Sequence, residues 1–112
     1  MTDDAAIDLL RPAGTGPLWG AGSADLNATL LAWPAGHRMV EHTNTELDVL
    51  IVVLDGSGVA TVDQRDHALS AGHALLIEKG SSRSIRAGAG GIRYLSVHRR
   101  RAPLQVEPSA PR

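Results

Sequence analysis

The residues best suited to chemistry gather in one short stretch near the middle of the chain. His42 and Asn44 stand two residues apart, and the carboxylates Glu41, Glu46 and Asp48 surround them. An imidazole that a carboxylate orients can act as a general base, and the same groups can ligate a metal ion. The chain has no cysteine, which excludes a thiol nucleophile, a disulfide framework and an iron–sulfur centre.

Two other catalytic arrangements find little support. The serines at 57, 81, 82 and 84 lie in or beside glycine-rich turns, but no G-x-S-x-G elbow accompanies them. The glycine-rich segment 88–91 is not followed by a helical pattern, so it predicts a hairpin turn and not a phosphate loop.

Composition limits the class of protein. A chain of 112 residues with 43% hydrophobic residues predicts one globular domain. Its longest apolar run, residues 49–54, is too short to cross a bilayer, and no signal-peptide pattern opens the chain, so we expect a cytoplasmic protein without a membrane partner. Aromatic residues are 3% of the chain and the one basic run is residues 99–101, which argues against nucleic acid as a partner.

Charge is divided unevenly along the chain. Residues 1–78 carry 11 acidic residues against three arginines, whereas residues 79–112 carry one acidic residue against one lysine and seven arginines. Such a division is typical of a solvated surface, of complementary packing within or between subunits, or of an anion site near the basic part.

The two ends of the chain differ from its middle. Residues 2–11 have the start signals of a short helix that Pro12 would end, and residues 12–22 predict a loop anchored by Leu18 and Trp19. We therefore expect an N-terminal arm over residues 1–24. Residues 99–112 carry three prolines and predict a C-terminal tail.

The middle of the chain, residues 25–98, predicts an all-β domain. Short apolar or alternating runs are separated by glycine, proline and polar turn residues, and hardly any helical pattern interrupts them. Eight strands are expected, at 26–33, 38–42, 47–54, 59–63, 67–70, 74–77, 84–87 and 92–98. This spacing is typical of a β-sandwich or barrel.

The turn residues also resemble the two motifs of the cupin superfamily. Gly36, His42, Asn44 and Gly56 follow the first motif, G-x5-H-x-H-x3,4-E-x6-G, and the segment from Gly72 through residues 78, 80 and 83 follows the second, G-x5-P-x-G-x2-H. The resemblance covers about residues 25–98. It implies a double-stranded β-helix, a jelly-roll barrel with a pocket at one mouth, and a homodimer.

The sequence departs from the cupin pattern at the metal ligands. The resemblance puts His42 at the first ligand position, Asn44 at the second, Val49 at the glutamate and Arg83 at the last histidine. Valine and arginine offer no lone pair to a metal, and an amide is a weak ligand. We therefore expect no cofactor at this site, and His42, Asn44, Val49 and Arg83 to face the barrel mouth as a binding pocket.

Three functions stay open. The first is a non-enzymatic or accessory protein that binds a small anionic metabolite through Arg83, unless an acidic side chain pairs with that arginine. The second is a cupin enzyme, either a dioxygenase or isomerase with a transition metal on His42, Asp48 and His98, or a metal-free isomerase or epimerase. The third is an interaction module with a collapsed barrel.

Overall fold

The computed structural model describes residues 6–100, apart from the side chain of His42. These residues form an all-β domain of seven strands and no helix. The strands are β1 (Gly16–Gly22), β2 (Leu26–Trp33), β3 (His42–Thr43), β4 (Val49–Val62), β5 (Arg65–Ser70), β6 (Ala74–Ile77) and β7 (Ser82–Arg99). All pairings between them are antiparallel.

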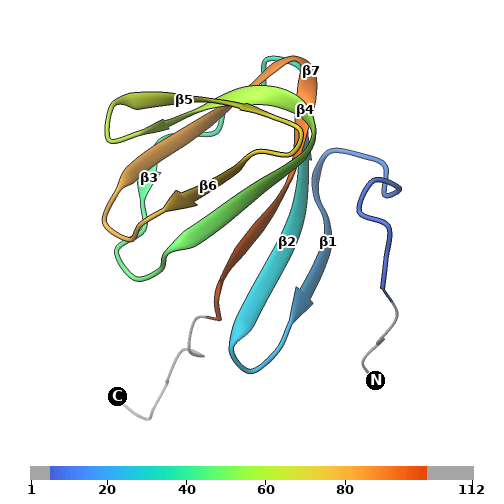
Figure 1. The fold of residues 1–112 in the computed structure, drawn as a ribbon, viewed down its shortest axis with the longest axis horizontal. Coiled ribbons are helices and arrows are strands. Elements are labelled where there is room, and N and C mark those ends of the chain that lie inside the picture. The colour runs from blue at the N-terminus through green and yellow to red at the C-terminus, as the bar shows by residue number, and fades with distance from the viewer. Residues whose placement is uncertain (1–5, 101–112) are drawn as a thin grey trace, which may run out of the picture.

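The long strands β4 and β7 bend sharply, so each contributes to two layers (Figure 1). Residues 49–56 of β4 and 92–99 of β7 lie in the order β1-β2-β7-β4-β6, which we call sheet I. Residues 58–62 of β4 and 82–87 of β7 lie in the order β3-β7-β4-β5, which we call sheet II. The expected jelly-roll architecture is therefore confirmed.

Glycine makes the bend possible where β4 and β7 cross from one sheet to the other. Gly56 and Gly91 have φ angles of 78° and 81°, a region that other residues rarely adopt. A Cβ on Gly56 would overlap the carbonyl oxygen of Gly91, and a Cβ on Gly91 would lie 2.7 Å from the carbonyl oxygen of Trp33. Only glycine lets the two strands and the end of β2 approach this closely.

Alternation along the strands places the hydrophobic core between the two sheets. Val49, Ile51 and Val53 of β4 are at most 3% exposed, and Ile85 of sheet II and Tyr94 of sheet I pack with them. Burial of such side chains contributes about 1.5–3 kcal/mol each. This core fixes which face of each strand looks into the barrel.

The structure corrects the strand list at its bends and at residues 38–42, where only an isolated bridge at Arg38 and the two-residue strand β3 form. The predicted strands 26–33 and 74–77 match β2 and β6. The pairs of strands predicted on either side of residues 55–58 and 88–91 are single bent strands, β4 and β7. Turn residues stand at both places, but β-bulges absorb the change of direction and keep the strands continuous.

The structure also corrects the N-terminal arm. Residues 16–22, expected in a loop, form β1 at the edge of sheet I, where a bulge after Pro17 tolerates the proline and the glycines. The described part of the expected helix, residues 6–11, forms turns and no helix. The Arg93 guanidinium instead holds this segment by donating to the carbonyl oxygens of Leu9 and Pro12, at 2.9 and 2.7 Å.

Candidate functional site

The inner face of sheet I is apolar on one pair of strands and partly polar on another. Residues opposite each other on paired strands share a face, so the register assigns each side chain to the inside or the outside. On β4 and β6 the inner face is apolar and belongs to the core. On β2 and β7, away from the bend, it carries four partly buried polar side chains, Asn27, Thr29, Ser96 and His98.

Arg83 lies on the inner face of sheet II. Its strand neighbours in that sheet are His42 of β3 and Val62 of β4, and two residues further along β7 stands the buried core residue Ile85. Partial burial lowers the pKa of Arg83, and the proximity of Tyr94 opposes this effect. The two side chains therefore approach each other from opposite sheets.

Tyr94 carries the most deeply buried hydroxyl of the site. The residue is 1% exposed, and burial raises the pKa of its phenol, whereas the hydrogen bond from Trp33 and the charge of Arg83 lower that pKa. The Trp33 indole Nε1–H donates to the Tyr94 oxygen at 3.2 Å, and the Tyr94 hydroxyl donates to the Met39 sulfur at 3.2 Å. The His37 ring stacks on Trp33 with centroids 4.3 Å apart.

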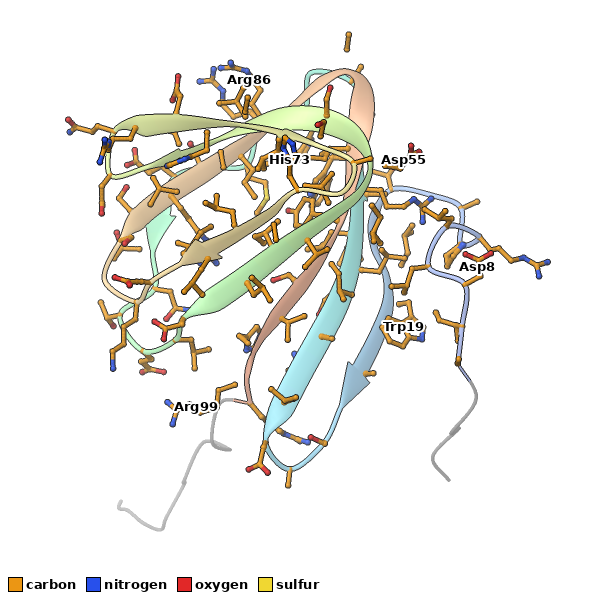
Figure 2. All side chains as sticks on the ribbon, in the orientation of Figure 1. Asp8, Trp19, Asp55, His73, Arg86 and Arg99 are labelled. Atoms are coloured by element: carbon orange, nitrogen blue, oxygen red, sulfur yellow. The ribbon has the colours of Figure 1, made fainter. Side chains whose placement is uncertain are left out.

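No acidic side chain pairs with Arg83 among the described residues. Asp48 accepts the backbone N–H of Lys79 at 2.8 Å, and Glu41 accepts the hydroxyl of Ser82. In Figure 2 the labelled Arg86, on the same strand, extends away from the barrel. Arg83 therefore differs from Arg86, because its guanidinium is partly buried and no opposite charge lies beside it among the described residues.

Three of the four inner polar side chains of β2 and β7 also have no partner among the described residues. Asn27, Thr29 and Ser96 make no side-chain hydrogen bond to another described residue. His98 makes one, from Nδ1 to the carbonyl oxygen of Arg99 at 2.8 Å. Because a carbonyl oxygen only accepts, Nδ1 carries the proton, and Nε2 of the neutral ring keeps its lone pair.

The four residues predicted to form the pocket take different places. Val49 is 2% exposed and packs in the core. Asn44 is partly buried, and its side-chain oxygen accepts the backbone N–H groups of Glu46 and Leu47, which stabilises the turn before β4. The backbone of His42 pairs with Arg83, while its side chain lies outside the described residues.

The residues of the alternative metal set do not lie together, as far as the structure describes their side chains. Asp48 is exposed at the start of β4 and bonded to Lys79, whereas His98 stands opposite the next residue, Val49, on the inner face. Within residues 6–100, leaving aside the His42 side chain, no three His, Asp or Glu side chains gather to hold a metal ion.

Sequence reasoning missed Tyr94, Trp33 and the polar residues of β2. Tyr94 is the only tyrosine in the chain, and its alternation with Ser96 and His98 was the available signal. That signal was ambiguous, since a tyrosine on a barrel strand is as typical of a core as of a site. Which strand faces Arg83 depends on the bend in β7.

Comparisons with known proteins support the fold. No family model and no curated protein matches the sequence. Among solved structures, the protein TT1209 from Thermus thermophilus superposes with a TM-score of 0.74 at 23% identity, covering 87% of this chain and 98% of that one. A cupin protein from Bacteroides fragilis has a TM-score of 0.71 at 19% identity, covering 94% and 91%. KdgF from Halomonas sp. has a TM-score of 0.69 at 18% identity, covering 74% and 76%.

These likenesses and the two-layered barrel define the class: the chain has the cupin fold, as its two motifs predicted. Identities below 25% establish the fold alone. The described residues contain no helix that could span a membrane.

Proposed function

We propose that this cupin-fold protein is a non-enzymatic or accessory protein that binds a small, hydroxylated anionic molecule inside the barrel. Arg83 is the anchor for a carboxylate or phosphate of that ligand. The observation that carries the proposal is the partly buried guanidinium of Arg83, which has no carboxylate partner among the described residues.

A partly desolvated charge without a partner destabilises the folded protein, so its presence calls for a compensating group. The guanidinium fork matches a carboxylate or phosphate in a two-pronged geometry, and such charge-assisted hydrogen bonds are about twice as strong as neutral ones. A bound anion would supply the missing charge. The raised pKa of Tyr94 keeps its hydroxyl protonated at neutral pH, so the anion would meet no second negative charge there.

The remaining polar groups indicate the rest of the ligand. Asn27, Thr29 and Ser96 offer an amide and two hydroxyls on the same inner face, without partners among the described residues. Groups that both donate and accept fit the hydroxyls of a polyol chain or a sugar acid. We infer that binding needs no metal of the kind that the superfamily motifs hold, because Val49 and Arg83 occupy two of the ligand positions.

Calorimetric titration with three matched probes tests this proposal. Gluconate offers a carboxylate and hydroxyls, hexanoate a carboxylate alone, and glucitol hydroxyls alone. Gluconate is expected to bind best, and Arg83→Ala to weaken it by at least about tenfold, as expected for loss of a charge-assisted pair. Arg86→Ala, which removes an exposed arginine from the same strand, is the matched control and should leave binding unchanged.

A second readout locates the ligand. Because Arg83 lowers the pKa of Tyr94, an anion that neutralises Arg83 should raise that pKa in a phenolate absorbance titration. If gluconate and hexanoate each bind Arg83→Ala as tightly as wild type, or bind neither protein, the proposal is wrong and an interaction module becomes the better hypothesis.

A metal-free isomerase or epimerase is the second candidate, and the hydrogen bond of His98 favours it. Donation from Nδ1 to Arg99 leaves Nε2 as a base on the inner face, near the polar groups that would hold the ligand. Incubation of gluconate in deuterated water tests for proton abstraction. Deuterium incorporation that His98→Gln abolishes would favour the enzyme, and no incorporation would favour the binding protein.

A further inference from the structure

The hydroxyl of Tyr94 has one ordinary and one weak hydrogen-bond partner. Its oxygen accepts the indole Nε1–H of Trp33 at 3.2 Å, and its hydrogen points to the sulfur of Met39, also at 3.2 Å. A thioether sulfur is a weak acceptor, whereas a hydrogen bond to a charged oxygen is about twice as strong as one between neutral groups. The Tyr94 hydroxyl is therefore bonded to an acceptor that an oxyanion would replace.

The backbone places this hydroxyl beside the part of sheet II that carries Arg83. Met39 lies at the edge of that sheet, because its backbone N–H donates to the carbonyl oxygen of Ile85 at 2.9 Å. Ile85 and Arg83 are alternate residues of β7 on the same inner face, about 7 Å apart along the strand. The Tyr94 side chain thus crosses the barrel from sheet I and ends near the row of Ile85, next to that of Arg83.

Arg83 and Tyr94 lie close together without a bond between them. Burial raises the pKa of Tyr94, and the hydrogen bond from Trp33 and the charge of Arg83 oppose that rise, so the guanidinium lies near the phenol. The guanidinium nevertheless makes no hydrogen bond to another described residue. Because one oxygen of a carboxylate or phosphate has lone pairs for two donors, an oxyanion between the two side chains would satisfy both.

We propose that Tyr94 is a second anion-binding residue, whose hydroxyl leaves the Met39 sulfur and donates to the oxyanion that Arg83 holds. This role of Tyr94 rests on the proposed function, in which Arg83 anchors the ligand. Trp33 donates to the Tyr94 oxygen in both arrangements, so only the hydroxyl hydrogen changes its partner. Met39 and the ligand therefore compete for one hydrogen.

This exchange makes the site selective for an anion over an alcohol. A ligand hydroxyl is a neutral acceptor, so it gains less than an oxyanion from the Tyr94 hydrogen. It also leaves the guanidinium without a compensating charge. Tyr94 is therefore expected to distinguish an acid from the corresponding alcohol, such as gluconate from glucitol.

Calorimetric titration with gluconate tests the exchange. Tyr94→Phe keeps the ring and should weaken gluconate binding about tenfold, as expected for loss of a hydrogen bond to a charged group. Met39→Leu, a substitution of similar volume, should tighten gluconate binding about twofold, because the hydroxyl then gives up no acceptor when the ligand binds. In the Tyr94→Phe background, Met39→Leu should leave the affinity unchanged. A merely structural tyrosine would not produce this coupling.

The two tryptophans of the chain provide a second readout in proton–nitrogen NMR spectra. The indole N–H of Trp33 donates to Tyr94 and should shift when gluconate binds, because its acceptor changes partner. Trp19, labelled on β1 in Figure 2, lies on the outer face of sheet I and is the internal control that should not shift. Tyr94→Phe should abolish the response of Trp33.

Two results would overturn this role of Tyr94. If gluconate binding depends on Arg83 but keeps the same affinity in Tyr94→Phe and in Met39→Leu, the proposed function holds and Tyr94 takes no part in it. If Tyr94→Phe does not fold, Met39→Leu decides alone, and gluconate binding that it leaves unchanged or weakens is contrary evidence. If gluconate does not bind the wild type, the proposed function fails, and the role of Tyr94 fails with it.

Discussion

The two faces of sheet I depart in part from the usual distribution of polar and apolar side chains. On the inner face, β2 and β7 present Asn27, Thr29, Ser96 and His98 towards the barrel, where a core residue would ordinarily stand. On the outer face, the same strands and their neighbours leave Leu26, Leu50 and Leu76 exposed. Exposed apolar patches and partly buried polar groups are the departures from ordinary folding that carry information.

The difference teaches that one alternation of side chains along the strands can give the two faces of a sheet different properties. The inner polar groups contribute little to the stability of the barrel, so they are better explained by a ligand. Of the outer apolar groups, Leu30 is fully buried and stabilises the monomer, whereas the exposed leucines contribute little to its stability. Substitutions that separate the two faces therefore test the comparison.

The largest effect is expected at the bend, which holds both faces in place. Gly56→Ala forces a Cβ against Gly91 in a backbone conformation with positive φ, and should lower the free energy of unfolding by about 4 kcal/mol. Gly72→Ala is the control, because Gly72 has φ 91° but open space around it, and its cost should be about 1 kcal/mol. Urea denaturation measures both, and equal costs would show that close approach at the bend is unimportant.

The next effect compares two neighbours in one row of the inner face. Ile51 on β4 and Ser96 on β7 are paired, but only Ile51 belongs to the core cluster. Ile51→Ala should lower the free energy of unfolding by about 3 kcal/mol, whereas Ser96→Ala should change it by less than about 0.5 kcal/mol. A large loss for Ser96→Ala in denaturant titrations would mean that the polar half of the face is structural.

A smaller effect of opposite sign is expected at the anchor. Arg83→Met replaces a partly buried, unpaired charge by an apolar chain of similar length, and should raise the free energy of unfolding by about 1 kcal/mol while it abolishes anion binding. Arg86→Met, at an exposed site, should stay within about 0.5 kcal/mol of wild type. Thermal unfolding without ligand measures both, and destabilisation by Arg83→Met would indicate a structural partner for the arginine.

The smallest effect is a change in stability with pH. The pKa of Tyr94 is raised in the folded protein, so folding favours the protonated phenol. The stabilising contribution is fully present below the ordinary tyrosine pKa of about 10 and is lost as pH rises through the higher folded value. Tyr94→Phe should remove this dependence from the unfolding curves.

The same group can be observed directly. The chain has a single tyrosine, so phenolate absorbance reports Tyr94 alone. Arg83→Met should raise its pKa further, because Arg83 lowers that pKa in the wild type. A Tyr94 pKa that does not respond to Arg83→Met would separate the two groups and weaken the ligand site built on both.

Local signals were sufficient for much of this fold. The limits of β2 and β6 follow from alternation and from the turn residues around them, and the glycines at 36, 56, 72 and 80 carried the likeness to the cupin motifs. These features depend on neighbouring residues in the chain. The same local signals misplaced the bends, because a glycine turn and a glycine bulge look alike in sequence.

The candidate site was only partly accessible to such reasoning. Arg83 was singled out by its place in the second motif, and the structure puts it on the inner face. Asn44 was expected in the pocket as well, but its oxygen caps the turn before β4. The sequence shows the same asparagine whether it lines a pocket or caps a turn, and only the path of the backbone distinguishes the two roles.

The sequence by itself determined the all-β class, the glycine framework and the replacement of potential metal ligands by valine and arginine, because composition and spacing along one chain specify those features. Tertiary structure alone decided that Trp33 donates to Tyr94, that Tyr94 lies near Arg83, and that no described carboxylate neutralises that arginine. It also placed exposed Leu26, Leu50 and Leu76 on one face of the sheet. Those relations join residues distant in sequence. They depend on the bends in β4 and β7, which set the register between strands and so determine which side chains face each other.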